Sequence, residues 1–377
     1  MINSEMDILE KPPQLDSIAS AMEDIRLGKI VIVVDDEDRE NEGDFICAAE
    51  CVTPAIINFM ATHGRGLICA PLDEKRVDEL KLQMMVRDNT ALHETAFTVS
   101  IDLIGHGCTT GISAHDRATG IRALIDPNIK AEDFARPGHI FPLRAKTGGV
   151  LRRSGHTEAA IDLARLAGFY PAGVLVEILN VDGTMARLPQ LVEIARQHDL
   201  KLISIQDLIA YRMEKERIIE RMPSYKISSR HGEWEVIPFR QLTNDDIHLA
   251  LIKGDPQNVD PVLVRVHSMS RTGDLLGLIF GETGKEIDHA LSMISKEKNG
   301  VFLLMRHHEI SDNLIEILRS YEQHTDPVSL QQQRDIGVGA QILCDLGVRR
   351  MKLMTNHPIP RIGLIGFGLE IVENIKI

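Results

Sequence analysis

Apolar residues in this chain fall partly in short continuous runs and partly in stretches with helical spacing. Residues 30–34 form a continuous apolar run, which predicts a short strand covered on both faces. Residues 17–27 show helical spacing, with Asp16 as the expected cap and Gly28 at the end. We predict further strands at 66–70, 96–101 and 174–179, and further helices at 54–62, 115–125, 158–167 and 188–198. Interleaved strands and helices indicate a layered α/β domain.

A second unit is expected after Tyr211. The segment 213–230 is highly charged and then rich in Pro and Ser, which is typical of a linker. Beyond it we predict strands at 261–266, 300–304 and 351–354 and a helix at 285–295. The expected organisation is an N-terminal extension (1–15), a first domain (16–212), the linker (213–230) and a second domain (231–377). We expect the α/β (α+β layered) class, with a mixed sheet covered by helices in each domain.

Composition and charge exclude several classes of protein. The chain has 377 residues, enough for two domains at about 150 residues each. It carries 42 basic against 55 acidic residues, a net charge of −13, so we expect no nucleic-acid partner. No apolar run approaches the ~18 residues of a membrane span, and the N-terminus lacks a signal-peptide core. Five cysteines make no disulfide framework. We therefore expect a cytoplasmic protein.

The acidic residues are concentrated directly after the first predicted strand. Residues 35–44 read DDEDRENEGD, with seven carboxylates in ten residues. Hard divalent cations prefer such oxygen ligands, so the segment is a candidate cation site, although an EF-hand is excluded by the position of Gly43. The alternative is a solvated acidic surface loop. Against it stand Arg39 inside the run and Glu40 and Glu42 on either side of Asn41.

A second group of polar residues combines glycine, arginine and histidine. It covers RPGHIFPLR (136–144) and the turn GGVLRRSGHTE (148–158), which precedes a predicted helix. A helix N-terminus offers free N–H groups and partial positive charge, which Arg153 and Thr157 would supplement, so we predict a phosphate site there. Structural roles are common for histidines. The shared basic, glycine-flanked setting of His139 and His156 favours a functional role for both.

These motifs together resemble 3,4-dihydroxy-2-butanone 4-phosphate synthase of riboflavin biosynthesis. The resemblance rests on DDEDRENEGD, Asp88–Thr90, TTGISAHDR (109–117), RPGHIFPLR and SGHTEAAIDLARLAG, and it runs over about 16–212. It implies a lyase that converts ribulose 5-phosphate to the four-carbon phosphate and formate. It also implies Mg²⁺ or Mn²⁺, no organic cofactor, and a homodimer.

The resemblance also implies roles for individual residues. Glu40 and His156 correspond to the metal ligands, and His139 and Glu177 to the essential acid–base groups. The fold or a dimer interface must bring these last two together. Asp38 and Glu42 are expected around the site, Cys69 near it or simply packed in the core, and 84–95 as a mobile lid. The residues expected to bind substrate are Arg39, Asp44, Arg153, Ser154, Gly155, Thr157 and Glu177.

The second half resembles GTP cyclohydrolase II, a zinc enzyme often fused to this synthase. The framework includes Arg265–Ser268, Thr272–Asp274, Gly337–Leu343 and Leu353–Asn356. Three Cys thiolates hold the zinc in that family. The corresponding residues here are Ser270, Gly281 and Thr283, so we expect no zinc and no cyclohydrolase activity. Other departures from the family pattern are the loop 306–313, which lacks the family glycines, Gln332 in place of an Asp and Pro360 in place of a Lys.

Three functional hypotheses follow. The first is a synthase with an inactive second domain. The second is a bifunctional enzyme that also hydrolyses GTP to the diaminopyrimidine precursor, and the missing thiolates argue against it. The third is a non-catalytic regulatory scaffold. The complete set of Glu40, His139, His156 and Glu177 argues against that one.

Overall fold

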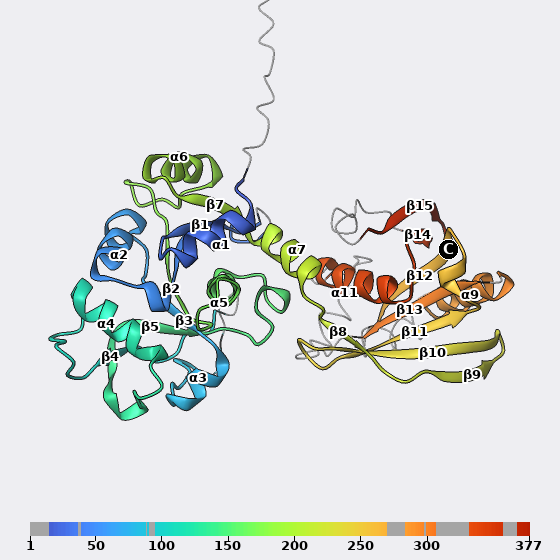
Figure 1. Ribbon diagram of the computed structural model, residues 1–377, viewed down its shortest axis with the longest axis horizontal. Coiled ribbons are helices and arrows are strands. Elements are labelled where there is room, and N and C mark those ends of the chain that lie inside the picture. The colour runs from blue at the N-terminus through green and yellow to red at the C-terminus, as the bar shows by residue number, and fades with distance from the viewer. Residues whose placement is uncertain are drawn as a thin grey trace, which may run out of the picture. The chain divides into compact units, whose positions relative to one another are not determined.

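The structure is a computed structural model in which the chain forms two compact units, one up to Ile209 and one from Ala210 (Figure 1). It describes residues 15–36, 39–87, 89, 95–269, 283–297, 299–306, 332–356 and 368–377. Each unit has a mixed β-sheet with helices packed on it, which confirms the predicted fold class.

The first unit is built on a seven-stranded sheet with the order β4-β5-β3-β6-β2-β1-β7. Neighbouring strands pair in parallel between β1 and β7 and between β3 and β5, and the other pairs are antiparallel. The strands are β1 (Val31–Val34), β2 (Gly43–Ala48), β3 (Cys69–Leu72), β4 (Ile101–Leu103), β5 (Phe134–Arg144), β6 (Gly173–Glu177) and β7 (Lys201–Ser204).

Helices cover both faces of this sheet, as the apolar run in β1 predicted. One face carries Ile32, Phe45 and Val176, which pack in a core with residues of α2 (Pro54–Phe59), α4 (Ala114–Ile125) and α6 (Leu188–His198). The opposite face is covered by α1 (Ile18–Arg26) and by α5 (His156–Leu166), which contacts β1, β2, β3 and β6. The unit also contains α3 (Glu74–Glu79), the π-helical turn Met60–Gly64 and the start of α7 (Ile205–Lys215).

Several local predictions need correction. Ser17, rather than Asp16, caps α1, because the Asp16 carboxylate accepts hydrogen bonds from Lys201 and from the Leu202 N–H. The strand predicted at 66–70 begins only at Cys69, and the one predicted at 96–101 forms as β4 at Ile101. Helix α5 starts at His156, two residues earlier than predicted, which places His156 and Thr157 in its first turn.

The second unit has an eight-stranded sheet with the order β15-β14-β12-β13-β11-β10-β8, and β9 also pairs with β10. Phe302 and Leu263 pack against Ile294 of α9 (Thr283–Lys296), whereas α11 (Gln332–Asp345) contacts β13 and β8. The strands are β8 (Ile219–Arg221), β9 (Tyr225–Ser229), β10 (Gly232–Gln241), β11 (Ile247–Lys253), β12 (Val262–Met269), β13 (Gly300–Arg306), β14 (Arg350–Met354) and β15 (Glu370–Ile375).

The segment 213–230 is therefore not a separate linker. It contains the end of α7 and the strands β8 and β9, and both strands pair with β10. The charged residues that suggested a linker lie at the end of α7 and in β8, and the Ser-containing part forms β9, in which every residue is exposed.

Candidate active site

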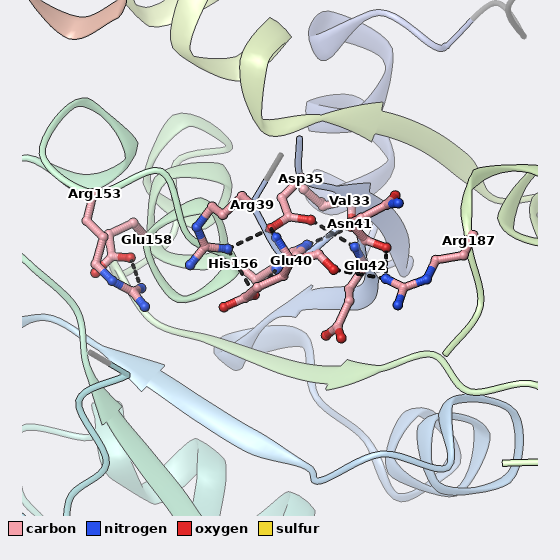
Figure 2. A network of polar contacts seen from close by, with 10 residues as sticks. All are labelled: Val33, Asp35, Arg39, Glu40, Asn41, Glu42, Arg153, His156, Glu158 and Arg187. Atoms are coloured by element: carbon pink, nitrogen blue, oxygen red, sulfur yellow. Dashed lines mark hydrogen bonds and ion pairs between the residues drawn. The ribbon is translucent and has the colours of Figure 1, made fainter. Parts of the chain in front are cut away.

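The acidic segment forms a tight loop between β1 and β2, organised around Asp35. The Asp35 carboxylate accepts hydrogen bonds from the backbone N–H groups of Glu40 (3.2 Å) and Glu42 (2.9 Å) (Figure 2). It also accepts one from Arg39 at 2.7 Å, and the same Arg39 nitrogen lies 2.9 Å from Glu40 Oε2. The loop is thus folded by its own charges, which argues against a loosely solvated acidic run. Glu37 and Asp38 lie outside the described residues.

His156 faces this loop from the first turn of α5. Its Nε2 lies 3.1 Å from the carbonyl oxygen of Val33, and its Nδ1 lies 3.8 Å from Glu40 Oε2. A metal-binding histidine characteristically donates one ring N–H to such a carbonyl and presents the other nitrogen to the metal. Ligand atoms of Asp35, Glu40 and His156 all lie within 4.8 Å of one another. The residues present therefore fit a divalent cation.

The site carries an excess of negative charge from its carboxylates. Burial raises the pKa of Asp44 to about 7, and the nearby carboxylates of Glu177 and Glu40 add to the rise, whereas His156 opposes it. Burial by itself lowers the pKa of His156, but the carboxylates of Asp44 and Glu40 outweigh it and raise the value to about 9. A cation bound here would replace the imidazole proton, because a histidine ligand must be neutral.

Asp44 and Glu177 extend the site across the sheet. They are directly paired in register, with Asp44 on β2 and Glu177 at the end of β6. Asp44 is 3% exposed, and its Oδ1 is buried without a hydrogen-bond partner. Glu177 Oε2 accepts a hydrogen bond from the Leu67 N–H at 2.9 Å. A buried carboxylate oxygen with no partner is costly, so a ligand or cation at this point of the sheet would relieve it.

His139 and Glu177 lie at the same end of β3, on its two sides. Cys69 of β3 is level with Phe141 on β5 and with Leu175 on β6. His139 precedes Phe141 by two residues in a strand parallel to β3, and Glu177 follows Leu175 by two in an antiparallel one. Side chains two apart share a face, and two strand spacings amount to about 10 Å. The fold thus brings them to one face, on strands separated by β3.

Asp102, which the sequence did not single out, holds His139. The His139 N–H donates to Asp102 Oδ1 at 2.9 Å, and His139 Nδ1 lies 2.7 Å from Asp102 Oδ2. A carboxylate only accepts hydrogen bonds, so the Nδ1 proton points at Asp102 and Nε2 faces outward. The His139 side chain is 46% exposed and thus accessible. The signal available in the sequence was an acidic residue directly after a predicted strand.

The predicted phosphate turn lies at the start of α5. Gly155 is the N-cap residue, and no side chain caps the helix. Arg153 forms an ion pair with Glu158 at 2.7 Å, and the other Glu158 oxygen accepts a hydrogen bond from the Lys146 N–H (2.9 Å). Thr157 is buried and Ser154 half-buried. The turn therefore offers uncapped helix N–H groups beside an arginine that is held in place, the arrangement that anions prefer.

Two further predictions concern Cys69 and the segment 84–95. Cys69 is buried, and burial raises the pKa of its thiol above the usual range, with further contributions from Glu177 and Asp44. It packs beside the site as a neutral thiol. Of the predicted lid 84–95, residues 88 and 90–94 lie outside the described residues.

In the second unit, most positions that depart from the cyclohydrolase pattern lie outside the described residues. Ser270 and Gly281 lie outside the described residues, as does the side chain of Thr283, whose backbone begins α9. The loop 306–313 is described only at Arg306, and Pro360 is not described. Arg265 is held on β12 by the Met354 carbonyl (3.0 Å) and lies 3.8 Å from Glu286. Within the described parts of the chain, the Asp35 cluster is the one group of three or more acidic, His or Cys side chains with converging ligand atoms.

Comparison with known proteins identifies the family. The family model described as 3,4-dihydroxy-2-butanone 4-phosphate synthase matches residues 19–211. The chain belongs to this synthase family. It is an enzyme of this type, in line with the resemblance found in its motifs. The model for GTP cyclohydrolase II matches residues 220–376.

Full-length relatives of this synthase share both halves. "Riboflavin biosynthesis protein RibBA" of Cytophaga hutchinsonii is 56% identical over 374 residues, covering 97% of this chain and 92% of the relative. The protein of the same name from Porphyromonas gingivalis is 51% identical over the same length, with the same coverage. The described residues include no helix long and apolar enough to cross a membrane.

Solved structures agree with this assignment. RibBX of A. baumannii, described as a two-domain 3,4-dihydroxy-2-butanone 4-phosphate synthase, has a TM-score of 0.79 and 42% identity, covering 96% of this chain and 99% of that one. A synthase in complex with two magnesium ions has a TM-score of 0.52 and 44% identity, covering 53% of this chain and 98% of that one.

Proposed function

We propose that the first unit converts ribulose 5-phosphate to 3,4-dihydroxy-2-butanone 4-phosphate and formate, with a divalent cation held by Glu40 and His156. The observation that carries the proposal is the convergence of Glu40, His156 and Asp35 next to the buried, partnerless oxygen of Asp44. The magnesium-containing synthase structure supports the choice of Mg²⁺, and Mn²⁺ has the same oxygen preference. A bound cation stabilises negative charge that develops on substrate oxygens.

The remaining residues divide the work of binding and proton transfer. Arg153, Ser154, Gly155 and Thr157 bind the substrate phosphate at the start of α5, where helix N–H groups attract anions. Arg39 and Asp44 bind substrate near the cation.

His139, held by Asp102, and Glu177 move protons from opposite sides of β3. Glu177 keeps its carboxylate in place through the Leu67 N–H. The backbones of their two strands are about 10 Å apart and the side chains share a face, so a substrate bound over β3 would lie between the two groups. A second copy of the chain that supplies one of the two groups is the alternative.

Formate release from ribulose 5-phosphate tests the assignment. We expect E40Q and H156A each to lower the rate by at least about a hundredfold, because each removes one of two proposed metal ligands. EDTA should inactivate the enzyme and Mg²⁺ should restore it. Arg196→Met on α6 is the matched control, since Arg196 is exposed and pairs only locally with Glu193. Full activity in E40Q or H156A would refute the metal site.

We further propose that the second unit has no cyclohydrolase activity and binds no zinc. The support is chemical, since Ser270, Gly281 and Thr283 cannot supply thiolates. The match to the cyclohydrolase model and the RibBA relatives favour the alternative of a bifunctional enzyme. Formate release from GTP by the purified full chain decides between them. Turnover of GTP, or about one tightly bound zinc per chain, would refute this part of the proposal.

The expected homodimer and cytoplasmic location also remain proposals. Large exposed apolar side chains in the first unit, Leu67, Met85, Ile104 and Ile112, support a contact with a second copy. Sedimentation equilibrium of the full chain tests the dimer. Five free cysteines suit a reducing compartment, and the net charge of −13 disfavours a nucleic-acid partner.

A further inference from the structure

Arg187 connects the start of α6 to the acidic loop. Its Nη1 donates to the carbonyl oxygen of Glu40 at 2.9 Å and also to that of Asn41. Figure 2 shows the guanidinium beside this part of the loop backbone. The side chain is half-buried, and the Arg187 N–H is itself held by Gln190 Oε1 at 3.1 Å. These bonds join residues almost 150 positions apart.

The loop's own hydrogen bonds use the carbonyls of Asp36 and Glu42 and the carboxylate of Asp35 as acceptors. The carbonyls of Glu40 and Asn41 accept from Arg187 instead. Asn41 has a φ of 54°, a left-handed conformation that asparagine adopts more readily than most residues other than glycine. Arg187 binds two carbonyls at this turn of the backbone. It therefore restrains the backbone that carries the Glu40 side chain.

The start of α6 touches the loop at a second place. A Cβ on Gly43 would clash with Leu191 Cδ1, so the backbone at the end of the loop lies directly against α6. The short connection from Glu177 to Arg187 is closed by the Ala186 N–H, which donates to the Ile178 carbonyl at 3.0 Å. One segment thus joins the strand end that carries Glu177 to the loop that carries Glu40.

We propose that Arg187 is a positioning residue that presets residues 39–43 of the acidic loop for the divalent cation. The proposal rests on the proposed function, since it takes Glu40 as a ligand of that cation. Charge alone predicts the opposite effect. A guanidinium close to a cation site repels the cation, so its removal would tighten binding if Arg187 acted only through its charge. If Arg187 acts by ordering the loop, its removal weakens binding.

Measuring Mn²⁺ binding to the full chain without substrate distinguishes an effect of charge from an effect of loop ordering. The electron paramagnetic resonance signal of free Mn²⁺ gives the dissociation constant. We expect Arg187→Met to weaken binding about 10- to 100-fold, the usual effect of removing a residue that orients a metal ligand. Arg187→Lys, which keeps the charge and the stem but loses the planar fork, should fall between. Arg196→Met on the same helix is the control and should bind as the unaltered chain does.

The outcomes are distinct. Binding by Arg187→Met as tight as in the unaltered chain, or tighter, overturns the proposal. If circular dichroism shows that Arg187→Met does not fold, the test rests on Arg187→Lys. Mn²⁺ binding by Arg187→Lys as tight as in the unaltered chain then overturns the proposal. Glu40→Gln is measured alongside. If it leaves Mn²⁺ binding unchanged, the metal assignment itself fails; if it abolishes binding while the Arg187 variants have no effect, only the role of Arg187 fails.

Discussion

The pairing of Asp102 with His139 shows how one carboxylate prepares a side chain for proton transfer. Asp102 uses one oxygen for the His139 backbone and the other for its ring, so both the position of the residue and its tautomer are fixed. A histidine that is held in this way presents a single nitrogen to the substrate. The ring also loses less rotational freedom on reaching the reactive geometry.

Asp102→Asn should therefore impair the reaction without preventing substrate binding. An amide can donate to Nδ1 and so favours the opposite tautomer, with the proton on Nε2. We expect kcat for formate release to fall at least roughly tenfold, part of the 10²–10⁴ that acid–base catalysis supplies, while KM changes little. Asp102→Glu should recover part of the rate. The ¹⁵N shifts of the His139 ring should report the change of tautomer.

Asp199→Asn is the matched control, because Asp199 lies in a left-handed C-cap that asparagine also tolerates. An unchanged tautomer together with unchanged kcat in Asp102→Asn would contradict this role. If His139→Ala loses activity while Asp102→Asn keeps full activity, His139 is essential and Asp102 is not needed for its role.

The sequence predicted the candidate ligands better than their partners. Glu40 and His156 stand in motifs that local chemistry makes conspicuous. Asp102 and Arg187 stand in no such motif. Asp102 acts on a residue 37 positions away and Arg187 on one 147 positions away, through contacts that only the folded sheet creates. The roles of Asp35 and Arg39 within the loop were equally hidden. The sequence indicated that seven carboxylates would repel one another. It did not indicate which of them would accept hydrogen bonds from the backbone of the loop.

At the scale of elements, periodicity succeeded where a segment is buried regularly. The run at 30–34 became β1 and the helix at 188–198 was placed correctly as α6. It failed at β5, because Pro137, Gly138 and Pro142 are residues that strands usually avoid, and no strand was predicted there. Strand pairing then put His139 on the sheet. His139 and Glu177 come to one face of the sheet because β3 pairs with both of their strands. No local sequence pattern indicates this pairing.

Strand β12 carries a histidine whose environment makes the second unit sensitive to acid. His267 is 8% exposed. Burial lowers its pKa to about 4, and the cationic Arg265 adds to the effect. The unfolded chain, with an ordinary value near 6.5, binds more protons than the folded chain between these limits. The contribution of a neutral His267 is therefore fully present above pH 6.5 and is lost as the pH falls toward 4.

We expect the free energy of unfolding of the second unit to fall by up to about 3 kcal/mol between pH 7.5 and pH 4, and His267→Leu to remove most of this dependence. Trp234, the single tryptophan of the chain, is 4% exposed in this unit, so its fluorescence during urea unfolding reports the unit selectively. His289→Gln, on an exposed site of α9, is the control. An equally steep pH dependence in His267→Leu would show that other groups cause it.

At the scale of the whole molecule, the two units differ in what holds their central residues together. In the first, Glu40, Asp44 and Glu177 lie close enough to raise the pKa of Asp44, so the folded unit keeps unfavourable carboxylate contacts. A divalent cation bound there would relieve them. In the second, apolar packing around Trp234, Ile294 and Phe302 forms the core without such a cluster among the described residues. A cation that binds only the first unit must therefore stabilise that unit alone.

Calorimetry of the full chain with and without Mg²⁺ tests this difference. Mg²⁺ at about 100 times its dissociation constant stabilises the unit that binds it by about 2.7 kcal/mol, or roughly 5–10 °C in Tm for a unit of this size. The Trp234 fluorescence transition should not move, either with Mg²⁺ or after treatment with a zinc chelator. Glu40→Gln should abolish the shift of the first transition. A chelator that lowers the Trp234 transition would mean that the second unit holds a metal after all, because removing a bound metal takes away the stability that its binding supplied.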